Sequence, residues 1–298
     1  MENERQKRVA AIHDISCFGR CSLTVALPIL SAAGIETSAI PTAVLSTHTG
    51  GFAGYTYRDL TDEILPVVRH WRSLGLGFDA IYTGFLGSSE QIGIVMEAFG
   101  LLKGGSTLIA VDPVMADNGK LYSTFAPDFP DGMRKLCAKA DLIVPNLTEA
   151  ALLLGEEYRE GPCAPEESAR MLRALCGIGP RMAVLTGVSH DGVQLGAASY
   201  DSSTGEFGYA GARRIDSMYH GTGDVFASAL VAALIHGRSL GGACDAAVRF
   251  TVGAIERTRA AGTDSRFGVD FEAGLGAFAR EMAPMDAAAE GCRNGGTA

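Results

Sequence analysis

The tetrapeptide Gly221-Thr222-Gly223-Asp224 contains residue types that phosphate chemistry uses. Glycines allow backbone angles that turn several N–H groups toward one point, and a helix N-terminus adds a field that favours phosphate oxygens. The apolar run over residues 225–235 predicts such a helix directly behind the tetrapeptide. Asp224 would then lie beside a bound anion, where a carboxylate can take the proton of an attacking hydroxyl. The alternative is a glycine-rich helix start in which Asp224 only stabilises the first turn.

Asn146 and Glu149 are spaced so that two interpretations are open. In the first, Asn146 caps a helix and Glu149 reaches back to its amide, as in a capping box. In the second, the pair holds Mg²⁺ through water molecules, because this hard ion prefers a few oxygen ligands and keeps much of its hydration. Asp112 would add a second carboxylate to that site, although it can also be read as a turn residue before Pro113.

These residues need a scaffold that brings them together, and the chain alternates short β-branched runs with longer helical patterns. Near-continuous apolar strands that alternate with helices predict one α/β domain, in which helices cover both faces of a mostly parallel sheet. Ligands of such sheets bind beyond the carboxyl ends of the strands. The polar residues that follow predicted strands are Asp14, Thr49, Asp112, Asn146, Glu149 and Thr186.

No linker or internal repeat divides the chain, so we expect the domain to span residues 1–285 and the tail over 286–298 to be disordered. A loop is expected over residues 13–20, after a first strand from Arg8 to Ile12. The segment over 116–130 is rich in turn-forming residues, which predicts a flexible flap of the kind that covers a site.

The composition excludes several classes of protein. The chain has 25 Lys and Arg against 34 Asp and Glu, a net charge of −9 without a basic cluster, so we expect neither nucleic acid nor a membrane surface as a partner. Seven cysteines without a C-x-x-C pair favour a reducing compartment over a disulfide framework. The N-terminus lacks the apolar core of a signal peptide, and no apolar run is long enough to cross a bilayer. These features predict a cytoplasmic protein.

Taken together, the ordered motifs resemble the pyridoxal kinase branch of the ribokinase-like superfamily over about residues 8–283. The motifs are Asp14 to Gly19, Ser46-Thr47-His48-Thr49, Gly84 to Gln91, Asp112-Pro113-Val114-Met115, Pro145-Asn146-Leu147-Thr148-Glu149 and Gly221-Thr222-Gly223-Asp224. The resemblance implies ATP-dependent phosphorylation of the 5′-hydroxymethyl group of a B6 vitamer by a ribokinase-like enzyme. It also implies ATP and Mg²⁺ as cofactors, leaves a requirement for K⁺ open, and points to a homodimer.

The resemblance also implies roles for single residues. Asp224 would be the general base, and the amides of Gly221, Thr222, Gly223 and Asp224 would form the anion hole for the transferring phosphoryl group. Asp112 and Glu149 would organise Mg²⁺. The residues that the resemblance places at the nucleotide are Asp112, Asn146, Glu149 and Thr186. Those that it places at the vitamer are Asp14, Ser16, Thr47, Thr49 and Asp224.

One residue departs from the family pattern: Asp14 lies where many pyridoxal kinases have serine. A carboxylate beside the pyridine nitrogen would favour the protonated ring, so the preference among vitamers is expected to differ. Two alternatives to a pyridoxal kinase remain open. One is hydroxymethylpyrimidine or hydroxymethylpyrimidine phosphate kinase, which shares the fold and the anion hole, and the other is a vitamer-binding protein without catalysis. A dehydrogenase is disfavoured because the first strand leads into His13-Asp14-Ile15-Ser16 and not into G-x-G-x-x-G.

Overall fold

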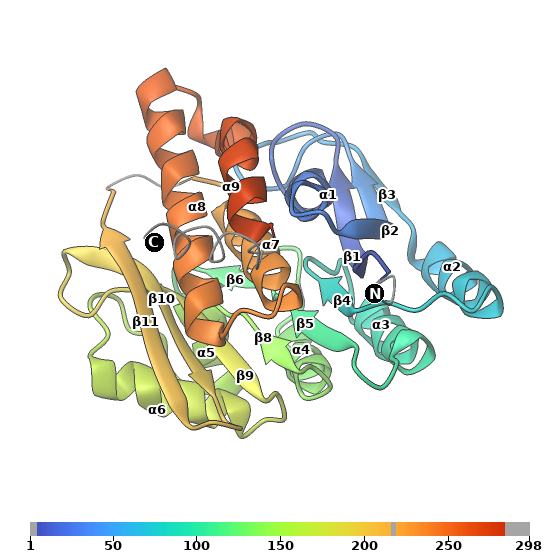
Figure 1. Cartoon of the computed structure of the whole chain (residues 1–298), viewed down its shortest axis with the longest axis horizontal. Helices are drawn as coiled ribbons and strands as arrows, with labels where there is room; N and C mark the ends of the chain where they lie inside the picture. Colours follow the sequence, from blue (N-terminus) through green and yellow to red (C-terminus); the bar gives the residue numbers. More distant parts are fainter. Residues whose placement is uncertain (1–4, 216–218, 284–298) are drawn as a thin grey trace, which may run out of the picture.

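The computed structural model describes residues 5–215 and 219–283. Its centre is a nine-stranded sheet (Figure 1). In spatial order the strands are β11 (Glu206–Arg213), β10 (Gln194–Asp201), β9 (Met182–Val188), β8 (Leu142–Ile143), β5 (Leu108–Val111), β4 (Ala80–Thr83), β1 (Arg8–Ser16), β2 (Glu36–Leu45) and β3 (Tyr57–Asp59). The strands from β9 to β2 pair in parallel, whereas β10, β11 and β3 are antiparallel to their neighbours. The predicted mostly parallel sheet is confirmed.

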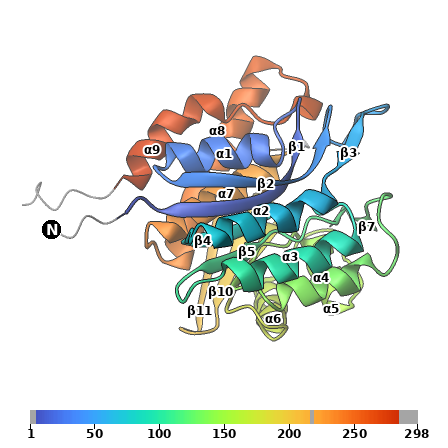
Figure 2. The ribbon, with the colours of Figure 1, turned by 90° about the vertical axis from the view of Figure 1, so that its right-hand side faces the viewer.

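Helices cover both faces of the sheet, as Figure 2 shows edge-on. One face carries α1 (Leu23–Ala32), α7 (Thr222–Ile235), α8 (Leu240–Ala261) and α9 (Leu275–Met282), together with the short turns η1 (Ser265–Phe267) and η2 (Glu272–Gly274). The other carries α2 (Thr61–Ser73), α3 (Ser89–Leu102), α4 (Phe129–Cys137), α5 (Leu147–Leu154) and α6 (Pro165–Cys176). A hairpin of β6 (Ala116–Asp117) and β7 (Lys120–Leu121) lies apart from the main sheet.

The protein has two hydrophobic cores, one on each face of the sheet, because side chains alternate between the two faces along each strand. Val9 packs with α1 and α7 on one face, and its neighbour Ala10 packs with α2 and α3 on the other, because successive side chains of a strand point to opposite faces. Every residue of α7 from Val225 to Ala233 is buried. A helix that is apolar on all sides belongs in the interior. The α7 helix therefore holds its N-terminus, and Asp224 with it, rigidly against the sheet.

The first strand is longer than predicted. We expected a loop after Ile12, but β1 continues to Ser16, with a register shift against β2 between His13 and Ile15. Pairing with β2 keeps these polar residues extended, so Asp14 lies within a strand. The short strands β3, β6 and β7 were not predicted either. Residues 286–298, predicted to be a disordered tail, lie outside the described part of the chain.

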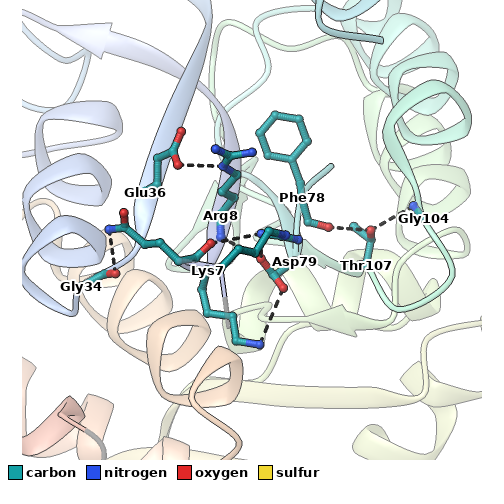
Figure 3. A network of polar contacts seen from close by, with 10 residues as sticks. Lys7, Arg8, Gly34, Glu36, Phe78, Asp79, Gly104 and Thr107 are labelled. Atoms are coloured by element: carbon teal, nitrogen blue, oxygen red, sulfur yellow. Dashed lines mark hydrogen bonds and ion pairs between the residues drawn. The ribbon is translucent and has the colours of Figure 1, made fainter. Parts of the chain in front are cut away.

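At the amino edge of the sheet, two aspartates accept hydrogen bonds from neighbouring strands, and Figure 3 shows one of them, Asp79. Asp79, just before β4, accepts a hydrogen bond from the backbone N–H of Arg8 in β1 at 2.8 Å, and the Arg5 guanidinium lies 2.8 Å from the same carboxylate oxygen. Asp141, just before β8, accepts in the same way from the N–H of Ile109 in β5 at 2.8 Å. The strand order is thus stabilised at the edge away from the predicted site.

We expect Asp79→Ala to lower the free energy of unfolding by about 1–3 kcal/mol, because the N–H of Arg8 and the nearby cations lose their acceptor. Urea unfolding would measure this change. Glu97→Ala is the matched control: it removes an exposed ion pair with Arg69, which should contribute little. Equal losses in the two variants would contradict the role of Asp79.

Candidate active site

The N-terminus of α7 has the geometry of an anion hole. Gly221 adopts a left-handed conformation with φ of 74°, and a Cβ built on it would lie 1.9 Å from the carbonyl oxygen of Arg20. Only glycine fits there. The first intrahelical bond runs from the N–H of Val225 to the carbonyl of Gly221 at 3.0 Å. The N–H groups of residues 222–224 therefore have no acceptor within the helix and can bind phosphate oxygens.

Asp224 lies in the first turn of α7 as an unusually basic carboxylate. Burial raises its pKa to about 7; the N–H of Ser22 opposes this rise, and the charge of Asp14 adds to it. Cys21 lies close to both carboxylates: the pKa of its thiol is raised by burial and then by the charges of Asp224 and Asp14. A carboxylate with a pKa near neutrality can both accept a proton at physiological pH and release it afterwards.

Asp14 comes from β1 and is held by two hydroxyl groups. Ser22 donates to one carboxylate oxygen and Ser16 donates to the other at 3.2 Å, while the side chain is only 3% exposed. Burial raises the pKa of Asp14, and the two serine hydroxyls oppose this rise because they stabilise the charged form. The predicted vitamer residues Asp14 and Ser16 are thus brought together with Asp224.

Glu149 satisfies the capping interpretation in full. Asn146 accepts from the N–H of Glu149 at 2.9 Å, and Glu149 accepts from the N–H of Asn146 at 2.9 Å. The other oxygen of Glu149 accepts from the N–H of Met115 at 3.0 Å. Burial raises the pKa of Glu149 to about 8 despite these bonds. The residue therefore has a structural role, and its part in a metal site stays a prediction.

Asp112 is a buried carboxylate close to Glu149 and Asp224. Its pKa is raised by burial and then by the charges of Glu149 and Asp224, so the three side chains repel one another. Within residues 5–215 and 219–283, no cluster of three or more His, Cys, Asp and Glu side chains is spaced to hold a metal ion. Oxygen donors that need a counter-charge nevertheless fit Mg²⁺ bound jointly with ATP phosphates, because this ion keeps waters and substrate oxygens among its ligands.

Thr186 of β9 lies beside Asn146. The two residues form an isolated parallel bridge, and the N–H of Thr186 donates to the carbonyl of Pro145 at 3.0 Å. The predicted nucleotide residues thus meet along one edge. Thr222 begins α7, and its hydroxyl donates to the carbonyl of Tyr219 at 3.3 Å.

The segment predicted as a flap contains the β6–β7 hairpin, which is hydrogen-bonded to Asn146 and Thr148. Asn118 and Gly119 both have positive φ, 51° and 75°, as a tight hairpin turn requires. The N–H of Gly119 donates to the hydroxyl of Thr148 at 3.0 Å, and Asn146 donates through its side chain to the carbonyl of Ala116 at 2.8 Å. The segment was predicted as a flexible flap, and in the structure its first part forms this hairpin. Whether the hairpin closes over the nucleotide stays a prediction.

His48 fixes the loop between β2 and β3 through two hydrogen bonds, a role that the sequence did not indicate. Its Nδ1 accepts from the N–H of Gly50 at 3.1 Å and its Nε2 lies 2.6 Å from the carbonyl oxygen of Arg266. This pair of bonds requires a neutral ring with the proton on Nε2. Burial lowers the pKa of His48, which agrees with that form.

Around His48 the structure places both predicted threonines and a second histidine. The Thr47 hydroxyl is buried without a hydrogen-bond partner in the described chain, whereas Thr49 is exposed. The ring centroid of His220 lies 5.0 Å from that of His48, and a Cβ on Gly50 would lie 2.6 Å from the His220 ring. His220 was not predicted either, although its position directly before Gly221 was the signal that could have found it.

Comparison with known proteins identifies the family. The model of the phosphomethylpyrimidine kinase family matches residues 30–268. The chain belongs to this family. A protein of Bacteroides thetaiotaomicron, assigned as a phosphomethylpyrimidine kinase and crystallised with pyridoxal, is 39% identical to this member, with a TM-score of 0.87, and the match covers 92% of this chain and 96% of that one.

Two further proteins that are similar to this chain are named as kinases of pyridoxal. The Lactobacillus plantarum pyridoxal kinase is 35% identical, with a TM-score of 0.84, and the match covers 93% of this chain and 97% of that one. The pyridoxine/pyridoxal/pyridoxamine kinase of Bordetella avium is 28% identical, and the match covers 85% of this chain and 86% of the relative. The predicted family, fold and enzyme class are confirmed.

None of the helices in the described ranges is long and apolar enough to cross a membrane.

Proposed function

We propose that this protein transfers the γ-phosphoryl group of ATP to the 5′-hydroxymethyl group of a B6 vitamer, with Asp224 as the general base. The observation that carries the assignment of Asp224 is its place in the first turn of α7, beside the N–H groups of residues 222–224 that have no acceptor within the helix. Burial, which raises its pKa to about 7, supports the same role. Phosphoryl transfer needs positioning and neutralisation of charge more than covalent chemistry. The chain offers both at one edge of its sheet.

The roles of the residues follow from their places. Asp224 takes the proton of the acceptor hydroxyl, and the N–H groups of residues 222–224 donate to the transferring phosphoryl group. Asp14 holds the ring, supported by Ser16 and Ser22. Bound together with the ATP phosphates beside Asp112 and Glu149, Mg²⁺ would neutralise the charge of the phosphate oxygens. The assignments of Thr186 to the nucleotide and of Thr47 and Thr49 to the vitamer belong to the same proposal, as does a cytoplasmic homodimer.

Purified protein with ATP and Mg²⁺ should convert pyridoxal, pyridoxamine or pyridoxine to its 5′-phosphate, detected by mass spectrometry. The family name favours hydroxymethylpyrimidine and its phosphate as the second candidate substrates, so both belong in the same assay. Faster turnover of a pyrimidine would replace the proposed acceptor class. Binding of a vitamer without any phosphorylated product would indicate a non-catalytic binding protein.

The proposed base makes a prediction about pH. The carboxylate must be unprotonated to act, and its pKa is raised to about 7, so kcat/KM for the vitamer should rise with pH and level off above about 7. Initial rates between pH 5 and 9 at saturating ATP would show this rise in kcat/KM. A profile that is already flat below pH 6 would contradict Asp224 as the base.

The proposed ring contact makes a prediction about vitamer choice. Asp14→Ser removes the carboxylate that favours a protonated ring nitrogen and leaves a hydroxyl, so the ratios of kcat/KM among the three vitamers should change by about tenfold. Steady-state kinetics with each vitamer would measure the ratios. If all three values fall by the same factor, Asp14 does not select among the rings.

A further inference from the structure

A segment near the C-terminus contacts both loops of the proposed vitamer site. The first loop, residues 17–22, directly follows the vitamer residues of β1, and the second, residues 46–56, carries both proposed vitamer threonines. The contacting segment, residues 262–271, runs from the end of α8 through η1. It is remote from both loops in the sequence, so the fold alone brings the three together.

The segment is fixed to the loop of residues 17–22 by a backbone hydrogen bond and by charge. The N–H of Arg20 donates to the carbonyl of Phe267 at 3.1 Å, and the Arg20 guanidinium forms an ion pair with Asp270 at 2.9 Å. Gly268 allows this close approach, because its φ is 83° and a Cβ built on it would lie 2.6 Å from the Cβ of Arg20. The two backbones are therefore held in direct contact.

The same segment is fixed to the loop of residues 46–56 through Arg266. Its carbonyl oxygen lies 2.6 Å from Nε2 of His48, and its guanidinium lies 5.7 Å from the centroid of the Phe52 ring. A cation at this distance over an aromatic face is attracted by the ring. The loop contains three glycines, which makes it costly to order, so contacts that fix it in place reduce its freedom before any ligand binds.

The ring of Phe267 lies against one ring from each loop. It meets the Phe18 ring edge to face with centroids 5.1 Å apart, and it is parallel to the Phe52 ring, with an interplanar angle of 3° and centroids 6.3 Å apart. Both distances lie in the range that aromatic pairs prefer. None of the three rings belongs to either hydrophobic core, and Phe18 is 51% exposed. The contacts of these rings therefore act between the loops and not within the interior.

We propose that Phe267 is a positioning residue whose ring joins the two vitamer loops and orders them before the substrate binds. A loop that is already ordered loses less conformational entropy when it binds a ligand, so the vitamer binds more tightly. Phe267 acts through the loops and does not touch the substrate. The inference rests on the proposed function and deepens it, because it assigns part of the acceptor selectivity to a residue outside the site.

Phe267→Ala should raise KM for the vitamer by about tenfold, the order of change that lost aromatic pairs produce. KM for ATP should stay within about twofold and kcat within about threefold, because the proposed nucleotide residues Asn146 and Thr186 and the base Asp224 lie in other segments. Phe267→Tyr keeps the ring and should return the vitamer KM to within about twofold of the parent. Steady-state kinetics with pyridoxal, pyridoxamine and pyridoxine would measure these values.

Hydrogen exchange tests the order of the loop without relying on activity. The N–H of Gly50 donates to Nδ1 of His48 at 3.1 Å, and the N–H of Ser46 donates to the opposite end of the loop at 3.2 Å. These amides should exchange about tenfold faster in Phe267→Ala, because the loop opens more often when the ring contact is lost. Mass spectrometry of peptides that cover residues 46–56 would measure the rates.

Phe207→Ala is the matched control. The Phe207 ring is 38% exposed and stacks on the Tyr200 ring with centroids 4.2 Å apart, and the Arg173 guanidinium lies 4.5 Å from its centroid. It lies in the edge strand β11, away from the vitamer loops in the order of the sheet. This variant also loses an aromatic pair and a cation beside it, so it should melt at a lower temperature, but its vitamer KM should stay as in the parent.

Two results would overturn the inference. One is an unchanged KM for every vitamer in Phe267→Ala, and the other is an equal rise in KM for vitamer and ATP, which would indicate a general loss of structure. Should Phe267→Ala melt below the assay temperature, Phe18→Ala decides in its place, since its ring is exposed, and an unaltered vitamer KM there would contradict the proposal. A parent protein that phosphorylates none of the three vitamers would instead reject the proposed function, while faster exchange in Phe267→Ala would still support the ordering of the loop.

Discussion

Asp224→Asn is expected to lower kcat by about 10²–10⁴-fold, the range that a positioned general base contributes. KM for both substrates should change little, because the amide keeps the shape of the side chain. The same variant should melt at a higher temperature than the parent at pH 8. Burial has raised the pKa of Asp224 from 3.8 to about 7, so the folded state carries the charge at a cost above that pH.

The sign of this stability change can be checked across pH. A carboxyl whose pKa is raised on folding lowers stability fully above the folded pKa and not at all below the unfolded one. The gain of Asp224→Asn should therefore be largest above pH 7 and should vanish near pH 4. Asp245→Asn, an exposed change on α8, is the control and should alter neither kcat nor melting. If the Asp224→Asn protein is active and less stable than the parent, it would contradict both the role of Asp224 as the base and the proposed cost of burying its charge.

Among substitutions that add one methyl group at the site, Gly221→Ala is expected to disrupt the structure most. The left-handed backbone alone costs about 1–2 kcal/mol for a residue with a Cβ. The Cβ would also lie 1.9 Å from the Arg20 carbonyl oxygen, so the loops before α1 and α7 must move apart. We expect a lower melting temperature and a loss of kcat of about 100-fold or more, because the N–H groups would no longer point at the phosphoryl group.

Gly223→Ala is the matched comparison for stability. A Cβ on Gly223 meets no atom within 4 Å, and its backbone is helical, so its melting temperature should equal or exceed that of the parent. Differential scanning calorimetry of the two variants separates conformational strain at Gly221 from the mere addition of a methyl group. Identical melting of both variants would show that the approach of Arg20 to Gly221 is not a constraint.

Much of this architecture could be predicted because its signals are local. The alternation of apolar runs and helical patterns predicted the mostly parallel sheet, and the apolar run over residues 225–235 predicted α7 nearly at its observed bounds. The tetrapeptide at the start of α7 indicated a backbone freed by glycines and a carboxylate, and the structure places Gly221 in the left-handed region. By contrast, β1 extends through polar residues because β2 pairs with it, and pairing partners distant in the sequence leave no local signal.

The candidate site was predicted less completely, for a similar reason. Asp14, Asp112, Asn146 and Glu149 could be proposed because strands end near them. His48 and His220 act through contacts between loops that are far apart in the chain, as the bond from His48 to Arg266 illustrates. The hairpin over 116–121 appeared flexible from its turn residues, but Thr148 and Asn146 anchor it, and both lie in a different segment.

The aspartates at the amino edge bear on how this fold can change its substrate. Asp79 and Asp141 hold neighbouring strands together from the end of the sheet that carries no site residue. Residues at the other end can therefore be exchanged without weakening the contacts that define the strand order. Such a separation lets a lineage acquire a new acceptor by mutations that leave folding intact. Directed evolution of vitamer choice should accordingly begin with residues 13–22, at the end of β1 and in the loop after it, and with the loop of residues 46–56, with the amino edge left unaltered.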